Sequence, residues 1–210
     1  MPLETWNRLE EAPESKPWFL QIKAIDPLNT FQLIPFPHSV HPPVQVTATV
    51  ELKNQLLRIK YQIQGPGLAS ILIPYPEPKA SSPSRKDLLW QHTCFELFLT
   101  KRDDPSYYEL NLSPSGDWNF YRFSGYRSDQ KTEALIQTAP LTRSEMKSKE
   151  EYRLDAAIDL SPLLSAQHSE LLLGVTTVLE TKDAKKSYWA LTHCGEQPDF
   201  HRRESFKPLT

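Results

Sequence analysis

The sequence predicts an all-β protein, an antiparallel and jelly-roll-like β-sandwich of about ten strands with few short helices. Apolar and polar residues alternate over short runs, most clearly within 44–63, 89–123 and 152–180. Alternation with a period of two is typical of strands that bury one face. The chain also has 19 prolines against six glycines, and prolines between short apolar runs favour loops and strand ends over long helices.

The first predicted strands include a hairpin. The run FQLIPF at 31–36 predicts a strand. Every second residue from Val44 to Leu52 is apolar, which indicates a strand with one buried face. A short polar turn then leads into a second alternating run at 56–63. Two such runs on either side of a short turn predict a β-hairpin.

The middle of the chain predicts four further strands. A strand at 68–73 precedes residues 74–87, a polar loop rich in proline and serine. Loops of this length are often mobile or functional. The runs 89–99, 107–112 and 118–123 then alternate and are separated by turn residues, so we expect three successive antiparallel strands.

The last third of the chain adds the remaining strands. Residues 128–150 are highly charged and predict an exposed insert, either a helical turn or a disordered segment. Alternation returns at 152–158, and a short helix or turn follows at 159–164. The runs 171–180 and 188–192 are apolar and rich in β-branched and aromatic residues, so they predict the final strands.

A single domain is the expected organisation of residues 1–210. All-β domains often reach this length as one unit. Residues 1–30 contain several prolines and a short aromatic run, so we expect an N-terminal arm that packs on the body of the domain. A short helix can form within this arm at 5–11.

Composition and charge argue against nucleic acid and membrane partners. The formal net charge is −2, and no block of lysine and arginine stands out, whereas nucleic-acid binders carry a basic patch. The N-terminal region has neither the basic nor the apolar part of an export signal, and no run of about 18 apolar residues occurs. We therefore expect a cytoplasmic protein. Its two cysteines, Cys94 and Cys194, are expected to be reduced, and its oligomeric state stays open.

Three predicted strands carry a polar and aromatic face opposite an apolar one. In 89–99 the expected core face holds Leu89, Gln91, Thr93, Phe95, Leu97 and Leu99, and the other face holds Trp90, His92, Cys94, Glu96 and Phe98. In 107–112 the two sets are Tyr108, Leu110 and Leu112 against Tyr107, Glu109 and Asn111. In 118–123, Trp118, Phe120 and Arg122 alternate with Asn119, Tyr121 and Phe123. Hairpins between these strands would make Glu96, Glu109 and Asn111 cross-strand neighbours, with Arg122 or Trp118 nearby.

The sequence resembles a known family in three ordered segments. These are LWQHTCFELFL at 89–99, YYELNLSPSGDWNFYRFSGYR at 107–127 and PDFHRRESF at 198–206. They resemble DOMON-like ligand-binding domains related to family 9 carbohydrate-binding modules, in the branch found alone or fused to UDP-N-acetylenolpyruvoylglucosamine reductase. The resemblance spans roughly 44–206. It implies a β-sandwich that binds sugars or, in some relatives, haem, and it implies no catalysis.

The candidate site is a ligand-binding surface on the polar face. Its predicted residues are Trp90, His92, Glu96, Glu109, Asn111, Trp118, Arg122, His201 and Arg203. Aromatic rings suit the C–H face of a sugar, and carboxylate, amide and guanidinium groups meet its hydroxyls. We expect a small-molecule ligand, most plainly a sugar, with no cofactor, no metal and no catalytic residue.

Other interpretations stay open. The two tryptophans can be ordinary core residues, and the charged residues can form a purely structural ion-pair network. Two carboxylates on neighbouring strands could also serve as the acid and base of a glycosidase. His92, His193, His201 and Cys194 could ligate a metal, although their spacing matches no zinc pattern. At the level of function, the competing classes are a haem-binding redox domain and a module that docks another protein.

Overall fold

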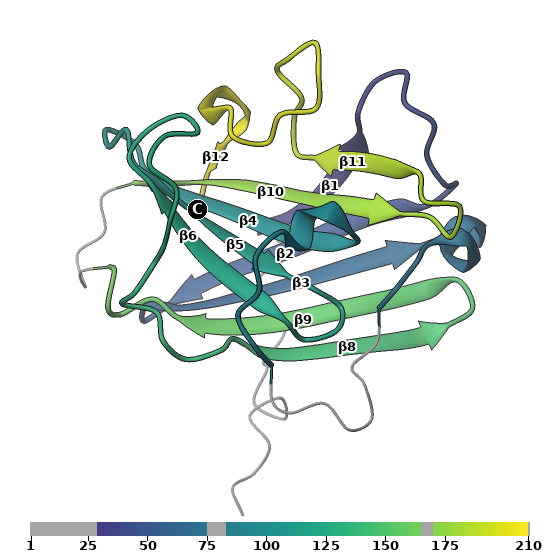
Figure 1. Cartoon of the computed structure of the whole chain (residues 1–210), viewed down its shortest axis with the longest axis horizontal. Coiled ribbons are helices and arrows are strands. Elements are labelled where there is room, and N and C mark those ends of the chain that lie inside the picture. Colours follow the sequence, from purple (N-terminus) through teal and green to yellow (C-terminus); the bar gives the residue numbers. More distant parts are fainter. Residues whose placement is uncertain (1–28, 75–82, 165–169, 210) are drawn as a thin grey trace, which may run out of the picture.

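The strands curl into two facing layers (Figure 1). This computed structural model describes residues 29–74, 83–164 and 170–209. Neighbouring strands are antiparallel along the order β7-β6-β5-β4-β10-β11-β1-β2-β3-β9-β8, and β12 pairs with β10. The predicted antiparallel β-sandwich is therefore confirmed.

The first layer contains the predicted hairpin and its neighbours. Its strands are β1 (Thr30–Pro35), β2 (Gln45–Lys53), β3 (Leu56–Gln64), β9 (Glu151–Asp159) and β8 (Leu141–Ser148). β1 pairs with β2 from Thr30 to Leu33 and with β11 through Ile34 and Pro35. It thereby passes from one layer to the other, as strands at sandwich corners do.

The second layer contains the three strands that the sequence singled out. Its members are β7 (Lys131–Thr132), β6 (Trp118–Phe123), β5 (Tyr107–Leu112), β4 (Cys94–Lys101), β10 (Leu171–Glu180), β11 (Lys186–Ala190) and β12 (Lys207–Pro208). β4 lies between β5 and β10, so its side chains are buried on both faces.

The hydrophobic core fills the space between the layers. Phe95 is fully buried there, with its ring 4.9 Å from Tyr61 and 5.9 Å from Tyr152. Leu97 and Leu99 lie on the same face of β4 and belong to the same core. The predicted core face of 95–99 is therefore confirmed. The Tyr61 hydroxyl donates a hydrogen bond of 2.5 Å to the Glu96 carbonyl and ties the two layers together.

Two predicted strands begin with 3₁₀ turns instead. Residues 66–70 form the 3₁₀ helix η3 (Pro66–Ser70), and only Ile71 makes a strand-like bridge, to Thr181. Residues 89–91 form η4 (Leu89–Gln91), closed by a hydrogen bond from the His92 N–H to the Leu89 carbonyl, so the strand starts only at Cys94. A third short helix, η5 (Arg203–Ser205), precedes β12. Alternation does not reveal such turns, because they depend on local backbone hydrogen bonds.

The charged segment at 128–150 contains a regular strand. The prediction of a helical turn or a disordered segment was wrong for 141–148, which form β8 and pair with β9 across a bulge near Met146. Most β8 side chains are exposed or half-buried. β8 ends the strand order, and charged residues are common on edge strands because they discourage pairing with other chains.

The remaining predictions concern the arm, the cysteines and the membrane. The predicted arm and the helix at 5–11 lie outside the described residues. Cys94 is buried, Cys194 is exposed, and both are free. Within the described part of the chain, no helix is long and apolar enough to cross a membrane.

Candidate ligand-binding site

A second aromatic cluster covers the outer face of the second layer. Phe98, Tyr107, Tyr121 and Phe123 point away from the main core, because they alternate with core residues on β4, β5 and β6. Phe200 and Phe206 of the C-terminal segment pack against them. Gly174 on β10 makes room for this segment, since a Cβ there would lie 2.7 Å from the Phe206 ring. The C-terminal segment therefore turns an outer sheet face into a walled surface.

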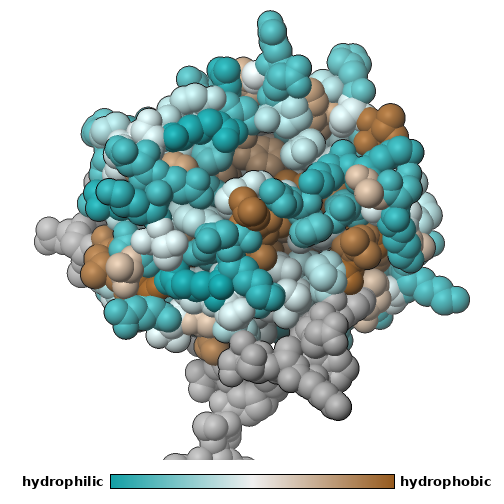
Figure 2. Space-filling model, viewed as in Figure 1, coloured by the Kyte–Doolittle hydropathy of each residue, from teal (hydrophilic) through white to brown (hydrophobic). Residues whose placement is uncertain are grey.

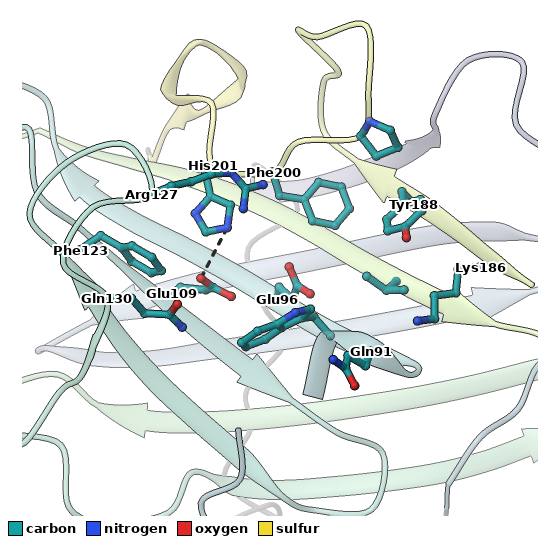
Figure 3. Close-up of a pocket in the computed structure, with 13 residues that line it drawn as sticks. Gln91, Glu96, Glu109, Phe123, Arg127, Gln130, Lys186, Tyr188, Phe200 and His201 are labelled. Atoms are coloured by element: carbon teal, nitrogen blue, oxygen red, sulfur yellow. Dashed lines mark ion pairs between the residues drawn. The ribbon is translucent and has the colours of Figure 1, made fainter. Parts of the chain in front are cut away.

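A pocket of about 340 Å³ opens in this surface. The polar and charged residues that line it are Gln91, Glu96, Glu109, Arg127, Gln130, Lys186 and His201, and the aromatic ones are Trp90, Phe123, Tyr188 and Phe200 (Figure 3). Figure 2 shows a largely hydrophilic surface with a hollow near the middle of this face, where apolar side chains are visible. Volumes of about 300–1,000 Å³ with few polar groups are typical of small-molecule sites.

Two buried carboxyl groups form the floor of the pocket. Glu96 and Glu109 are only 3% and 4% exposed. Glu96 on β4 is directly opposite Asn111 on β5, and the Asn111 amide donates a 2.8 Å hydrogen bond to Glu109 Oε1. Glu96 Oε2 accepts a 3.3 Å bond from the Thr176 hydroxyl of β10. The predicted neighbourhood of Glu96, Glu109 and Asn111 is therefore confirmed.

One carboxyl oxygen in this floor lacks a hydrogen-bond partner. Glu96 Oε1 is buried and contacts no donor within the described part of the chain. Buried polar atoms are rarely left unpaired, because the loss of hydration is costly. An oxygen of this kind at the base of a pocket is suited to a polar ligand group that forms a hydrogen bond with it.

Burial raises the pKa of both carboxyls in the floor. Burial, followed by the nearby Glu109, raises the pKa of Glu96 well above 4.5. Burial also raises the pKa of Glu109 to about 7, although the Asn111 hydrogen bond and Arg127 act in the opposite direction. The pair therefore retains a proton near neutral pH, mainly on Glu96.

His201 lies above Glu109 as a neutral imidazole. Burial and the nearby Arg127 lower its pKa to about 4. Its Nδ1 is 2.7 Å from the Tyr107 hydroxyl, whose oxygen also accepts the Arg127 backbone N–H. The Tyr107 proton therefore goes to Nδ1, which places the imidazole hydrogen on Nε2. Nε2 is 3.9 Å from Glu109 Oε2 (Figure 3), and with a neutral ring this contact is not an ion pair.

Arg127 joins the pocket to the C-terminal segment. Its Nη2 donates a 2.8 Å hydrogen bond to Asp199 Oδ1, and the Tyr126 hydroxyl donates to Asp199 Oδ2 at 2.6 Å. The backbone of Arg127 is left-handed, with φ of 50°. This geometry fixes the loop after β6 against the residues that precede His201.

Aromatic side chains form the walls. Trp90 comes from η4, is half-buried, and packs edge-on against Tyr121 with ring centroids 5.9 Å apart. Tyr188 of β11 packs edge-on against Phe200 at 6.1 Å. Polar groups on the floor and aromatic rings at the sides can hold a compact ring compound with hydroxyl or amine substituents.

The structure brings together four of the nine predicted site residues around the pocket: Trp90, Glu96, Glu109 and His201. Asn111 is fully buried beneath them and supports Glu109.

The other four lie elsewhere. Trp118 is a core residue on the inner face of β6, and Arg85 stacks on it at 4.1 Å. Arg122 lies on the same face of β6 as Trp118, because it is four residues further along the strand. Its side chain is exposed. The exposed His92 imidazole lies 2.7 Å from a Glu180 carboxylate oxygen. Arg203 donates to the backbone carbonyls of Lys101, Arg102 and Asp104.

Several pocket residues had no counterpart in the sequence prediction. They are Gln91, Phe123, Arg127, Gln130, Val178, Lys186, Tyr188, Pro198 and Phe200. Phe123 was not among the predicted site residues, and Gln91 was expected in the core. Arg127 and Gln130 belong to a loop, and loop residues carry no periodicity from which their direction can be read. The SGYR segment that follows β6 was the only available signal for Arg127.

The histidines do not form a metal site in the described part of the chain. Among residues 29–74, 83–164 and 170–209, no three His, Cys, Asp or Glu side chains gather as they would around a metal ion. His193 instead packs edge-on against Phe36 and lies 3.0 Å from the Ile34 carbonyl.

Comparisons with known proteins relate the chain to solved structures. No protein-family model and no curated protein matches it. A candidate carbohydrate-binding protein from Bacteroides uniformis ATCC 8492 has a TM-score of 0.62 and 16% sequence identity, over 85% of this chain and 84% of that one. This likeness shows a shared fold.

Two solved structures of a family 9 carbohydrate-binding module from Caldicellulosiruptor kristjanssonii have lower TM-scores. The structure with glucose has a TM-score of 0.43 and 16% identity, over 79% of this chain and 78% of that one. The structure with cellotriose has a TM-score of 0.44 and 17% identity, over 80% and 76%.

Proposed function

We propose that this chain is a non-catalytic carbohydrate-binding domain of the DOMON-like type, related to family 9 carbohydrate-binding modules. Its ligand is a sugar or a similar polar ring compound, held in the pocket on the outer face of β4, β5 and β10. The main support is Glu96 Oε1, a buried carboxyl oxygen without a hydrogen-bond partner in the described part of the chain, at the base of a pocket with aromatic walls. A sugar hydroxyl both donates and accepts hydrogen bonds, so it can pair with this carboxyl in either protonation state, and the ring above it can pack on Trp90.

The comparison with the Bacteroides uniformis protein agrees with this proposal. That protein shares the fold over most of both chains and is described as a candidate carbohydrate-binding protein. Fold alone does not establish function, so the weight of the proposal rests on the pocket. The DOMON-like resemblance of the sequence adds the expectation of binding without catalysis.

The competing classes receive less support from the site. A haem held by a Met/His pair would need a methionine near the pocket, but Met146 lies on β8 in the other layer. A protein-docking module would use a broad exposed surface, whereas Glu96 and Glu109 lie at the bottom of a hollow.

A thermal-shift screen tests the proposed function. Purified protein is heated with a panel of monosaccharides, disaccharides and nucleotide sugars, with haem as a further arm. A sugar present at about 100 times its Kd should stabilise the fold by about 2.7 kcal/mol, which corresponds to roughly 5–10 °C for a chain of this size.

Two variants then place the site. Trp90→Ala should weaken the sugar at least about tenfold, or about 1.4 kcal/mol, because it removes a pocket wall. Leu141→Ala removes an exposed apolar side chain from β8 and should leave affinity unchanged. Unaltered binding in Trp90→Ala, or a response to haem with none to any sugar, would contradict the proposal.

A further inference from the structure

We propose that the sugar bound in this pocket is an amino sugar, whose protonated amine lies between Glu96 and Glu109. This inference rests on the proposed carbohydrate-binding function and adds the chemical class of the ligand.

Once both floor carboxyls are deprotonated, they offer only hydrogen-bond acceptors. Within the described part of the chain Glu96 Oε1 has no hydrogen-bond partner, and the contact of Glu109 Oε2 with His201 Nε2 is 3.9 Å long. An ammonium group carries three donors and no acceptor. It can therefore satisfy both carboxyl groups at once, whereas a hydroxyl donates a single hydrogen bond.

The charge of the floor also favours a cation. Within the described ranges of the chain, no lysine or arginine forms an ion pair with Glu96 or Glu109. Burial, and then repulsion from Glu109, raises the pKa of Glu96 and keeps a proton on it. A bound ammonium group replaces that proton and removes the repulsion. Aromatic rings such as Trp90 and Phe123 in the walls are compatible with a cation.

The groups that surround Glu96 leave the space between Glu96 and Glu109 open to a ligand. They are Cys94 on the same strand, Thr176 on β10, Glu109 on β5, Arg127 after β6, and Tyr61 from the opposite layer. Arg127 is the cation among them, and its guanidinium is bonded to Asp199. Lys186 lies at the opposite end of the pocket from Glu109 (Figure 3), where it leaves the space between the carboxyls free.

Calorimetry with matched sugars tests the inference. D-Glucosamine, D-galactosamine and D-mannosamine are each compared with the parent hexose and the N-acetyl derivative, which lack the charge. At least one amine should bind about tenfold or more tightly than its two neutral counterparts, a difference of about 1.4 kcal/mol. Its affinity should rise from pH 6 to pH 7, and titrations in buffers of different ionisation enthalpy should show net proton release.

Variants assign the effect to the floor. Glu96→Gln keeps the shape of the side chain and should reduce the affinity for the amine to that for the parent hexose. Glu145→Gln, on β8 in the other layer, should keep the full preference. Neutral sugars that bind as tightly as the amine in all three series, or a preference that survives Glu96→Gln, would overturn the inference and leave carbohydrate binding intact. If no sugar of this panel or of the thermal-shift panel binds the folded protein, both proposals fail.

Discussion

Glu109→Gln should change how the stability of the fold depends on pH. Glu109 is 4% exposed, and its pKa rises from 4.5 to about 7 in the folded chain. Between these values the folded state holds a proton that the unfolded state has released. The contribution of Glu109 to the free energy of unfolding is therefore fully present below pH 4.5 and is lost as the pH rises to 7. One pKa unit corresponds to about 1.4 kcal/mol, so the loss amounts to about 3 kcal/mol.

His201 acts in the opposite direction and must be separated from this effect. Its pKa falls from 6.5 to about 4, so the unfolded state binds a proton that the folded state does not. Its contribution to stability is present above pH 6.5 and is lost as the pH falls to 4. The two effects nearly cancel in the wild type between pH 4.5 and 6.5. The difference between the variant and the wild type removes the histidine contribution, because both proteins contain His201.

Urea unfolding at pH 5, 6, 7 and 8 measures this difference. Glutamine can still accept the Asn111 hydrogen bond, so the variant should fold. The free energy of unfolding of Glu109→Gln, relative to that of the wild type, should rise by about 3 kcal/mol between pH 4.5 and pH 8. Most of this rise should occur between pH 5 and 7. Glu145→Gln is the control, because Glu145 is half-buried on β8 in the other layer and its pKa is lowered by Lys147, which places its effect at more acidic pH. Parallel curves for Glu109→Gln and the wild type would refute the buried-carboxyl argument.

Two further substitutions test the packing of the layers. Phe95→Ala should leave a cavity between Tyr61 and Tyr152 and cost about 3–5 kcal/mol in the free energy of unfolding; a cost below about 1 kcal/mol by urea titration would show that β4 does not face the core as described. Gly174→Ala places a Cβ 2.7 Å from the Phe206 ring and should cost about 1–3 kcal/mol. Limited proteolysis should then cut the C-terminal segment faster, and unchanged cleavage would contradict the packing of Phe206 on β10.

Part of the site could be read from the alternation of β5. Successive strand residues point to opposite faces, so the runs that place Leu110 and Leu112 in the core must also place Glu109 and Asn111 on the outer face. The same argument places Glu96 opposite Phe95. For these residues, local periodicity alone determines direction, and the structure agrees with it.

The same periodicity also explains the misplaced residues. Trp118 alternates with Asn119, and its indole suggested either a sugar platform or an ordinary core residue. β6 pairs Trp118 with Leu112, and this places the indole in the core. His92 falls outside β4 because η4 ends just before it, so the strand pattern did not apply to it.

The sequence by itself determined the fold class and the identity of the buried carboxyls, because both follow from a period of two that operates over neighbouring residues. Tertiary structure decided which other groups surround those carboxyls. Arg127 lies in a loop and is held at the pocket by its hydrogen bond to Asp199, 72 residues further along the chain. His201 is held there because Phe206 of the same C-terminal segment packs on the second layer. Such contacts depend on long-range packing and on backbone turns, and alternation along a strand carries no information about either.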